Sequence, residues 1–356
     1  MMSSFDTNME KNTCRICQII ETCTVTIARG DIMDSKWKDV LCALILGLIC
    51  PGVLVSMIQN AKIQSLPNET LISECSTITE TVRKDSQVAV LTNTGEIISM
   101  EWDEYITGVV LCEMPVEFEA EALKAQAVVA RTYALRRIST GGKHIGADVC
   151  TDPSCCQGYR DLSNFLESGG TEEQLNKVEN AVISTNSQVL LYNGEPIEAT
   201  YFSCSGGRTE DALAVWGAEI PYLRATDSPG EEKANHYTDT VHYSGEEFLK
   251  RLGLSSTVRP EGWVEEITYT EGGGVKDIRI CGQAFSGTKV RQLLGLRSTA
   301  FVISVVGEKV TITTKGFGHR VGMSQYGAEA MAVAGSNYKD ILNHYYQGTS
   351  LSEYSG

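Results

Sequence analysis

Apolar side chains from Trp102 onward repeat at helical spacing along the chain. The apolar positions are Trp102, Tyr105, Ile106, Val109 and Val110. Residues spaced in this way form one stripe on an α-helix, which predicts a helix with one buried face. Pro115 disfavours helical backbone at Met114, so we expect this helix to end near Glu113.

A second helix is predicted from about Val116 to Arg137. Acidic residues crowd its start and basic residues lie at its end, an arrangement that suits the helix dipole. A glycine pair at 141–142 follows, as is typical beyond a helix end. A third helix is predicted up to Ile183, with Thr171 as its N-cap.

Short apolar runs separated by turn residues predict strands elsewhere. The predicted strands are residues 88–91, 96–100, 189–192, 196–203, 264–270, 275–281, 301–306 and 309–314. Further helices are predicted at residues 245–252, 287–294, 322–334 and 338–345. Asn193–Gly194, between two predicted strands, is typical of a type I′ turn. The mixture predicts an α+β fold, with helices and antiparallel hairpins around a substrate cleft.

A membrane anchor is predicted near the N-terminus. The segment from Val40 to Met57 carries no charged side chain and approaches the length of a membrane-spanning helix, about 18 to 20 residues. Lys36 and Lys38 precede it, which places the N-terminus in the cytosol by the positive-inside rule. A cleaved signal peptide is the alternative. Because the apolar run is long and no clear Ala-x-Ala site follows, we expect an uncleaved, single-pass transmembrane helix in the cell membrane.

This anchor sets the predicted domain organisation. The parts are a cytosolic N-terminus (1–39), a transmembrane anchor (40–58), a polar stalk (59–86) and an extracytoplasmic domain (87–350). Residues 1–32 lack periodicity, whereas Met33 opens a run typical of the start of an anchored protein. We therefore expect translation to begin at Met33.

The net charge of −15 over 356 residues argues against a nucleic-acid-binding protein, which would carry a basic surface. It also argues against binding of an anionic polymer by overall attraction. An anionic substrate would have to be held in a local groove.

Glu113 is the first candidate for chemistry. Lys124 and Arg131 lie seven residues apart on the second helix, and therefore on one of its sides. If that side faces Glu113, three charges share one cleft. Apolar surroundings would raise the pKa of this carboxyl and nearby cations would lower it. The alternative is a structural cluster of ion pairs at a helix start.

A second candidate is a group of histidine and cysteine residues in the loop after the second helix. The group is His144, Cys150, Cys155 and Cys156. A histidine and several thiols in a short loop suit zinc. The alternative is a disulfide outside the membrane. A Cys155–Cys156 bond is disfavoured because adjacent Cα atoms lie too close together, but Cys150 with either partner stays possible.

Several long motifs, in order, resemble the stage II sporulation protein D family. They are Glu113–Pro115, Glu121–Tyr133, Tyr201–Glu210, Val215–Gly217, Pro221–Arg224 and Gly316–Gly327. The resemblance covers about Glu96 to Gly348. It implies that residues 87–350 form a lytic transglycosylase, which cleaves the bond between N-acetylmuramic acid and N-acetylglucosamine in peptide-stripped peptidoglycan strands. The products would carry 1,6-anhydro-N-acetylmuramic acid ends, formed during forespore engulfment in sporulation.

The resemblance also implies roles for single residues. Glu113 matches the catalytic acid/base of the family, and Lys124, Arg131 and Tyr201 match residues of its active groove. For Ser205, within Ser203–Gly207, we expect a turn whose backbone amides face a sugar. A nucleophilic serine is the alternative, but the Gly-x-Ser-x-Gly frame is lacking.

Further groove residues are expected in the Gly-rich Gly316–Gly327 motif. The side chains that we expect to bind substrate there are His319, Gln325 and Tyr326. For His319, a structural hydrogen bond is the alternative. For Trp216, stacking on a sugar ring and a position in the core are the two alternatives.

The zinc prediction gains support from the resemblance, since related clostridial proteins bind zinc. The family pattern has His, Cys and then His-Cys-Gln, and Cys155 stands where the second histidine would be. His144, Cys150 and Cys156 are therefore the expected Zn²⁺ ligands, with Cys155 as the fourth candidate. We expect a structural zinc rather than a catalytic one.

Partners follow from the resemblance as well. It implies peptidoglycan glycan strands as substrate, an amidase (stage II sporulation protein P) and a membrane scaffold (stage II sporulation protein M) as partners, and a place in the mother-cell engulfing membrane. An alternative is a non-catalytic glycan-binding activator of an amidase. A zinc amidase is a third possibility, disfavoured because hydrolytic zinc sites use histidine and carboxylate ligands with an open position.

Overall fold

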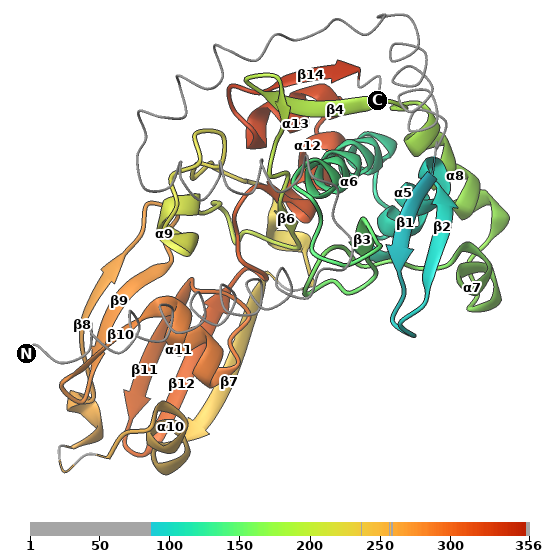
Figure 1. Cartoon of the computed structure of the whole chain (residues 1–356). Coiled ribbons are helices and arrows are strands. Elements are labelled where there is room, and N and C mark those ends of the chain that lie inside the picture. The colour runs from blue at the N-terminus through green and yellow to red at the C-terminus, as the bar shows by residue number, and fades with distance from the viewer. Residues whose placement is uncertain (1–86, 236, 256, 258, 354–356) are drawn as a thin grey trace, which may run out of the picture. The chain divides into compact units, whose positions relative to one another are not determined.

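The computed structural model describes residues 87–353, apart from 236, 256 and 258. The predicted N-terminus, anchor and stalk (1–86) lie outside the described residues and stay predictions. Among the helices of the described part, none has both the length and the apolar character needed to cross a membrane. The described chain mixes helices with antiparallel sheets, which confirms the α+β prediction (Figure 1).

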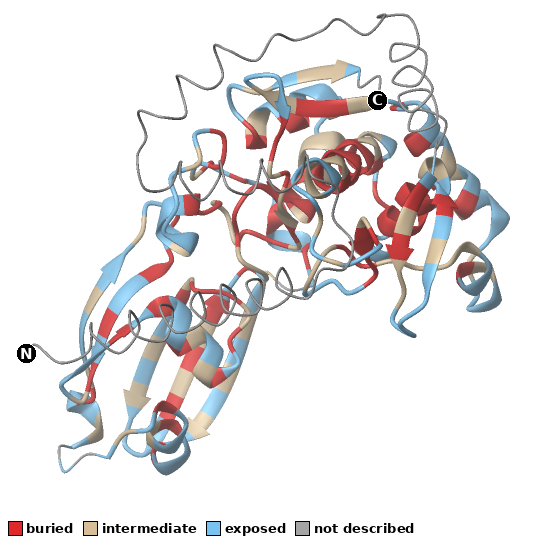
Figure 2. Ribbon diagram, in the orientation of Figure 1, coloured by how far each residue is buried: buried red, intermediate tan, exposed pale blue. Residues whose placement is uncertain are grey.

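The first hydrophobic core is built around helices (Figures 1 and 2). Its helices are α5 (Trp102–Glu113), α6 (Ala120–Ser139), α7 (Leu162–Glu167), α8 (Glu172–Ile183), α12 (Gln325–Val333) and α13 (Tyr338–Tyr345). Between Ala122 and Ala134, every residue of α6 except Lys124 is buried. A helix that is buried nearly all round needs neighbours on several sides. The contacts come from α5, α8, α12 and α13.

Two three-stranded sheets accompany this core. They consist of β1 (Gln87–Leu91), β2 (Ile97–Glu101) and β3 (Val149–Cys150), and of β4 (Gln188–Tyr192), β5 (Glu195–Pro196) and β14 (Ser350–Glu353). Asn193 and Gly194 between β4 and β5 have φ angles of 52° and 84°. Positive φ at both turn residues confirms the predicted type I′ turn.

The second hydrophobic core is built around sheets (Figure 2). Its strands are β7 (Thr238–Ser244), β8 (Val264–Tyr269), β9 (Val275–Ile280), β10 (Gln283–Ser286), β11 (Phe301–Val306) and β12 (Lys309–Lys315). They form two antiparallel sheets, in the orders β11-β12-β7 and β10-β9-β8. Helices α10 (Gly245–Leu252) and α11 (Gly287–Leu294) each begin after a serine N-cap and end at a left-handed glycine.

The predicted strand at 196–203 is wrong over most of its length. Strand β5 stops at Pro196, and β6 (Tyr201–Phe202) instead pairs in parallel with β13 (Met323–Ser324). Local alternation cannot reveal a partner so distant in sequence, because the pairing depends on the tertiary fold. This pairing brings the Tyr201 and Gly316–Gly327 motifs together.

Arg320 ties segments of the two cores together. It has a φ of 67°, uncommon for a residue other than glycine, and its side chain is buried. The guanidinium donates to Glu210 Oε1 at 3.1 Å, and to the carbonyl oxygens of Ser205 and Gly272 at 2.7 Å each. Glu210 Oε1 also accepts from the Gly274 N–H at 3.0 Å. This buried pair therefore joins the Tyr201–Glu210 motif to the turn between β8 and β9.

Candidate active site

Glu113 lies at the end of α5, as the helical pattern predicted. Its half-buried side chain lines a cleft of about 650 Å³. The N–H of Gly158 donates to Glu113 Oε1 at 2.8 Å. Burial raises the pKa of the Glu113 carboxyl above its ordinary value, while Gly158 and the nearby Tyr201 and Gln325 side chains offset part of the rise. Such a carboxyl keeps its proton to a higher pH, as an acid catalyst needs.

Gly158 can approach Glu113 closely because it has no side chain. A Cβ atom at this position would lie 2.8 Å from Cys112 Sγ and 3.0 Å from Glu113 Oε1. Both separations are shorter than ordinary contacts, so a larger residue would require the Cys112 and Glu113 side chains to shift. Glycine here therefore belongs to the construction of the site.

Tyr201 lines the same cleft, and its hydroxyl is hydrogen-bonded to Gln157. The Tyr201 hydroxyl donates to Gln157 Oε1 at 3.2 Å, and Gln157 Nε2 donates to the Tyr105 hydroxyl at 3.2 Å and the Ala130 carbonyl oxygen at 3.3 Å. Burial and the Glu113 carboxylate raise the pKa of Tyr201 well above its ordinary value. The hydroxyl therefore stays protonated beside Glu113, with its one proton donated to Gln157 Oε1.

Aromatic rings form another part of the cleft wall. Trp216 at the end of α9 (Ala212–Trp216) is 42% exposed and Phe317 is 39% exposed. The His319 ring lies 5.5 Å from the Trp216 ring, measured between centroids. The Val321 N–H donates to His319 Nδ1 at 3.1 Å, and burial lowers the pKa of His319 to about 4. The wall thus presents uncharged rings, which suit the apolar faces of sugars.

Besides Glu113, the charged side chains of the cleft lining have partners within the protein. Arg137 forms an ion pair with Glu198, and both residues line the cleft. Lys143 also lines it and donates to the carbonyl oxygen of Cys155. Glu198 is therefore a second carboxylate in the cleft, but one held in an ion pair by a guanidinium.

Lys124 and Arg131 do not line this cleft, so Glu113 does not share it with these two cations. They do share a helix face, and that face turns toward α8. Arg131 is buried and donates to the carbonyl oxygens of Thr185 at 2.8 Å and Gln188 at 3.1 Å. Lys124 pairs with Glu121 at 2.6 Å. In the described structure Arg131 fixes the end of α8, and Lys124 the start of α6.

Ser205 is fully buried and does not line the cleft. Its hydroxyl donates to Glu231 Oε2 at 2.7 Å, and the N–H of Gly206 donates to the same oxygen at 2.8 Å. The expectation that this turn offers its amides to a sugar is therefore corrected, because a buried carboxylate already takes them. The neighbouring Ser203 does line the cleft.

The Gly316–Gly327 motif divides between cleft and core. His319 and Gln325 line the cleft with Glu113. Tyr326 does not, because its ring packs edge-on against Phe118 with centroids 5.1 Å apart. Adjacent residues at a helix start point in different directions, which explains why only one of the pair reaches the cleft.

The predicted metal ligands come together in space. Ligand atoms of His144, Cys150, Cys155 and Cys156 all lie within 4.8 Å of one another. His144 Nε2 is 3.6 Å from the sulfur of Cys155 and 3.6 Å from that of Cys156, and these sulfurs are 4.0 Å apart. Tetrahedral zinc with bonds of about 2.0 to 2.3 Å needs ligand atoms roughly 3.5 to 3.8 Å apart. All three cysteines are free thiols. The donor set and spacing therefore fit zinc.

The metal cluster and the carboxyl are linked through consecutive residues. Cys156 belongs to the cluster, Gln157 holds Tyr201, and Gly158 donates to Glu113. Gln157, Arg137 and Glu198 are site residues that were not predicted from the sequence. A buried glutamine directly after a candidate ligand was the available signal, since ligands are commonly oriented by neighbouring hydrogen bonds.

Comparisons with known proteins show which sequences this chain resembles. The sequence model of the family described as SpoIID, stage II sporulation protein, matches residues 91–192. This range contains Glu113 and the four cluster residues. A protein called amidase enhancer from Bacillus subtilis is 30% identical over 307 residues, covering 70% of this chain and 40% of the relative.

Two longer matches cover nearly the whole relative. Stage II sporulation protein D of Bacillus amyloliquefaciens is 39% identical over 326 residues, covering 88% of this chain and 94% of the relative. The protein of the same name from Bacillus subtilis is 38% identical over 328 residues, with the same coverage of 88% and 94%. The chain therefore belongs to the stage II sporulation protein D family.

Proposed function

We propose that this protein is a peptidoglycan lytic transglycosylase that acts in sporulation. The observation that carries the proposal is the Glu113 carboxyl, half-buried in the cleft with a raised pKa and a protonated Tyr201 beside it. The cleft also offers exposed aromatic faces from Trp216 and Phe317. A carboxyl that keeps its proton to a higher pH, in a cleft with exposed aromatic rings, suits cleavage of a glycosidic bond.

The reaction needs one carboxyl in two roles. Protonated Glu113 gives its proton to the glycosidic oxygen, and the bond from that oxygen to C1 of N-acetylmuramic acid breaks through an oxocarbenium-like state. The carboxylate then takes the proton of the C6 hydroxyl, whose oxygen closes on C1. One strand leaves with a free hydroxyl and the other with a 1,6-anhydro ring, so no water is consumed.

Hydrolysis would require a second carboxylate to activate water. Among the described residues of the cleft lining, Glu198 is the other carboxylate, and its ion pair with Arg137 occupies it. Asp103 and Glu104, on the first turn of α5, do not line the cleft. These placements favour the anhydro product over the hydrolytic one.

The experiment is mass spectrometry of products from peptide-stripped glycan strands incubated with the full chain. We expect anhydro-muramic ends from the native protein and none from Glu113→Gln. Reducing muramic ends would instead mean hydrolysis, and Glu198→Gln would then identify the second carboxylate. Intact strands after prolonged incubation would contradict the proposed activity.

A second candidate function is activation of an amidase without cleavage of glycan. It is favoured by the relative called amidase enhancer. Here the cleft would bind glycan while the amidase, for which stage II sporulation protein P is our candidate, cuts. Faster amidase action with both native protein and Glu113→Gln, without anhydro ends, would select this function.

The proposal includes attachment to the engulfing mother-cell membrane through residues 40–58, with the scaffold stage II sporulation protein M as a further partner. Membrane fractionation of the full chain, compared with a chain lacking 40–58, tests the anchor. Retention of both forms with the membrane would show that another part of the complex is sufficient.

The His144, Cys150, Cys155 and Cys156 cluster is proposed to hold Zn²⁺. Three thiolates and one imidazole leave no open position at a tetrahedral ion, which is typical of structural sites. Bound there, zinc would fix the loop that carries Gln157 and Gly158. These two residues in turn position Tyr201 and Glu113.

We expect about one zinc ion per chain and a smaller amount in Cys150→Ser, because one thiolate ligand is lost. Metal removal by a chelator should also lower the melting temperature, since zinc binds the folded loop. Atomic emission and thermal melts measure both effects. Cys204→Ser is the control, because Cys204 is a buried free cysteine outside the cluster. Equal zinc content in Cys150→Ser and Cys204→Ser would contradict the site.

A further inference from the structure

Lys143 is an exposed cation in the lining of the Glu113 cleft. Its amine donates to the carbonyl oxygen of Cys155, and within the described chain it makes no ion pair with a carboxylate. A lysine amine has three N–H donors, so two remain available when one is used. Lys143 therefore offers the cleft both a positive charge and free hydrogen-bond donors.

The other basic side chains of the described lining are engaged differently. Arg137 forms an ion pair with Glu198, so a carboxylate of the cleft itself already balances its charge. His319 is uncharged near neutral pH, because burial lowers its pKa to about 4. Among the described side chains, Lys143 is therefore the partner that the cleft offers to an entering anion.

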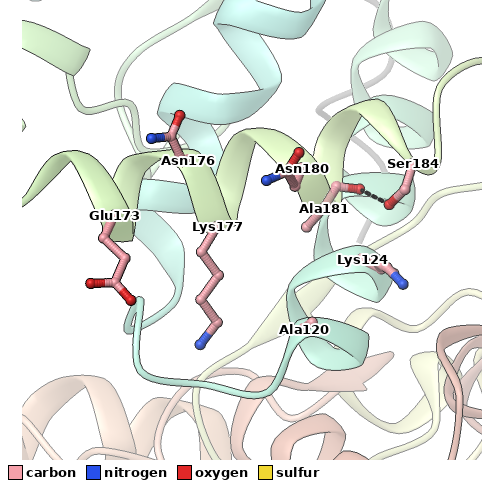
Figure 3. A pocket seen from close by; sticks show the side chains of 8 residues that line it. All are labelled: Ala120, Lys124, Glu173, Asn176, Lys177, Asn180, Ala181 and Ser184. Carbon is pink, nitrogen blue, oxygen red and sulfur yellow. Dashed lines mark hydrogen bonds between the residues drawn. The ribbon is translucent and has the colours of Figure 1, made fainter.

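Lysines near the start of α6 do not offer the same combination. A concavity of about 810 Å³ between α8 and α6 is lined by Lys124 and Lys177 (Figure 3). Lys124 pairs with Glu121 at 2.6 Å, and the Lys177 amine donates to two backbone carbonyl oxygens. Glu173 adds a carboxylate to the same lining. An anionic ligand is therefore better matched by Lys143 in the cleft than by this concavity.

Lys143 and Glu113 are tied to one short stretch of chain. The Lys143 amine binds the carbonyl oxygen of Cys155, and the N–H of Gly158 donates to Glu113 Oε1 at 2.8 Å. Gly158 follows Cys155 by three residues, and an extended chain spans at most about 3.6 Å per residue, or roughly 11 Å here. Lys143 is therefore within reach of the sugars that adjoin a bond held at Glu113.

The strand proposed as substrate carries a matching anion. Each N-acetylmuramic acid bears a lactyl group, which ends in a carboxylate once the stem peptide has been removed. While the peptide is attached, the same carbon belongs to a neutral amide. A cation in the cleft can therefore pair with a stripped strand at this position, but not with a substituted one.

We propose that Lys143 is a specificity-determining residue, which pairs with a lactyl carboxylate of a peptide-stripped strand bound in the Glu113 cleft. The inference rests on the proposed function for the nature of the ligand. It lets the cleft distinguish stripped from substituted strands by charge. Because Lys143 is exposed, we expect the pair to contribute about fivefold in affinity, the upper end for an exposed ion pair.

The experiment uses the full chain carrying Glu113→Gln, so that binding is measured without cleavage. Calorimetry compares peptide-stripped strands with the same strands after conversion of their lactyl carboxylates to methylamides. We expect the carboxylate strands to bind about fivefold more tightly, and this preference to shrink at high salt, which screens exposed charges.

Variants of Lys143 then test the residue. Lys143→Met should abolish the preference for carboxylate strands, Lys143→Arg should keep it, and Lys143→Glu should reverse it. Lys276→Met is the matched control, since Lys276 is an exposed lysine of β9 outside the cleft lining. Zinc content is measured in parallel, because Lys143 directly precedes the cluster residue His144, and we expect it to be unchanged.

A preference that survives in Lys143→Met would overturn the assignment. Equal weakening for both kinds of strand would overturn it as well, because Lys143 would then maintain the shape of the cleft without pairing with a carboxylate. A preference lost only together with zinc would have the same meaning. A Lys143-dependent preference in a protein that forms no anhydro ends would contradict the lyase and leave this inference intact.

Discussion

Replacing Glu113 by glutamine should lower the rate of anhydro-end formation by about a thousandfold, since general acid and base steps together contribute roughly 10² to 10⁴. Glutamine keeps the shape of the side chain but cannot give up a proton to the glycosidic oxygen. The rate of anhydro-end release from glycan strands measures the effect. Glu198→Gln is the control, because it removes the other carboxylate of the cleft.

The pH dependence of both the cleavage rate and the stability follows from the raised pKa of Glu113. As pH rises through that pKa the acid form disappears, so kcat/KM should fall on the alkaline side. The folded carboxyl also prefers its proton more than the unfolded one does, so its contribution to stability is present at low pH and lost as pH rises through the folded pKa. At a pH above the pKa of the folded carboxyl, the Glu113→Gln variant should melt at a higher temperature than the native protein.

For the rate prediction, a loss of rate in Glu198→Gln equal to that in Glu113→Gln would contradict the one-carboxyl mechanism.

Replacing Arg320 by methionine should lower the free energy of unfolding by about 3 to 5 kcal/mol, because Glu210 would be left as an uncompensated buried charge. The Arg320 and Glu210 side chains are 2% and 1% exposed. The change also removes the donors to the carbonyl oxygens of Ser205, Arg208 and Gly272. Thermal or urea unfolding measures the loss.

Arg208→Met is the matched control for this variant. Arg208 pairs with Asp227 and Glu271, whose side chains are 76% and 71% exposed. Exposed pairs contribute about 0 to 1 kcal/mol, so this variant should be close to the native protein in stability. A loss for Arg320→Met no larger than for Arg208→Met would contradict the structural role of the buried pair. Adding Glu210→Gln to Arg320→Met should recover part of the stability, since the buried charge is then removed.

The local sequence pattern was sufficient to predict many of the helix bounds. Helices α10 and α11 match their predicted bounds, because a serine cap and a terminal glycine mark both ends in the sequence. The end of α5 was found from Pro115. The start of α6 was predicted at Val116, whereas the helix begins at Ala120. The Phe118 N–H donates to the Pro115 carbonyl oxygen at 3.1 Å, so a separate turn precedes α6.

The site was predicted in part. Helical spacing correctly placed Lys124 and Arg131 on one face, but it could not tell which neighbour that face meets, and the neighbour is α8. Residues of the 144–156 loop come together as expected, because they are close in sequence. Gln157 and Glu198 acquire their roles only through contacts with Tyr201 and Arg137 from distant segments. Such contacts have no local signature.

The parallel pairing of β6 with β13 has a consequence for timing. Glu113 lies early in the described chain. His319 and Gln325 lie on either side of β13, near the end of the described chain. Contacts between residues so far apart in sequence form slowly, because a long loop must close first. A chain whose synthesis has stopped before residue 319 therefore carries Glu113 without these residues of the cleft.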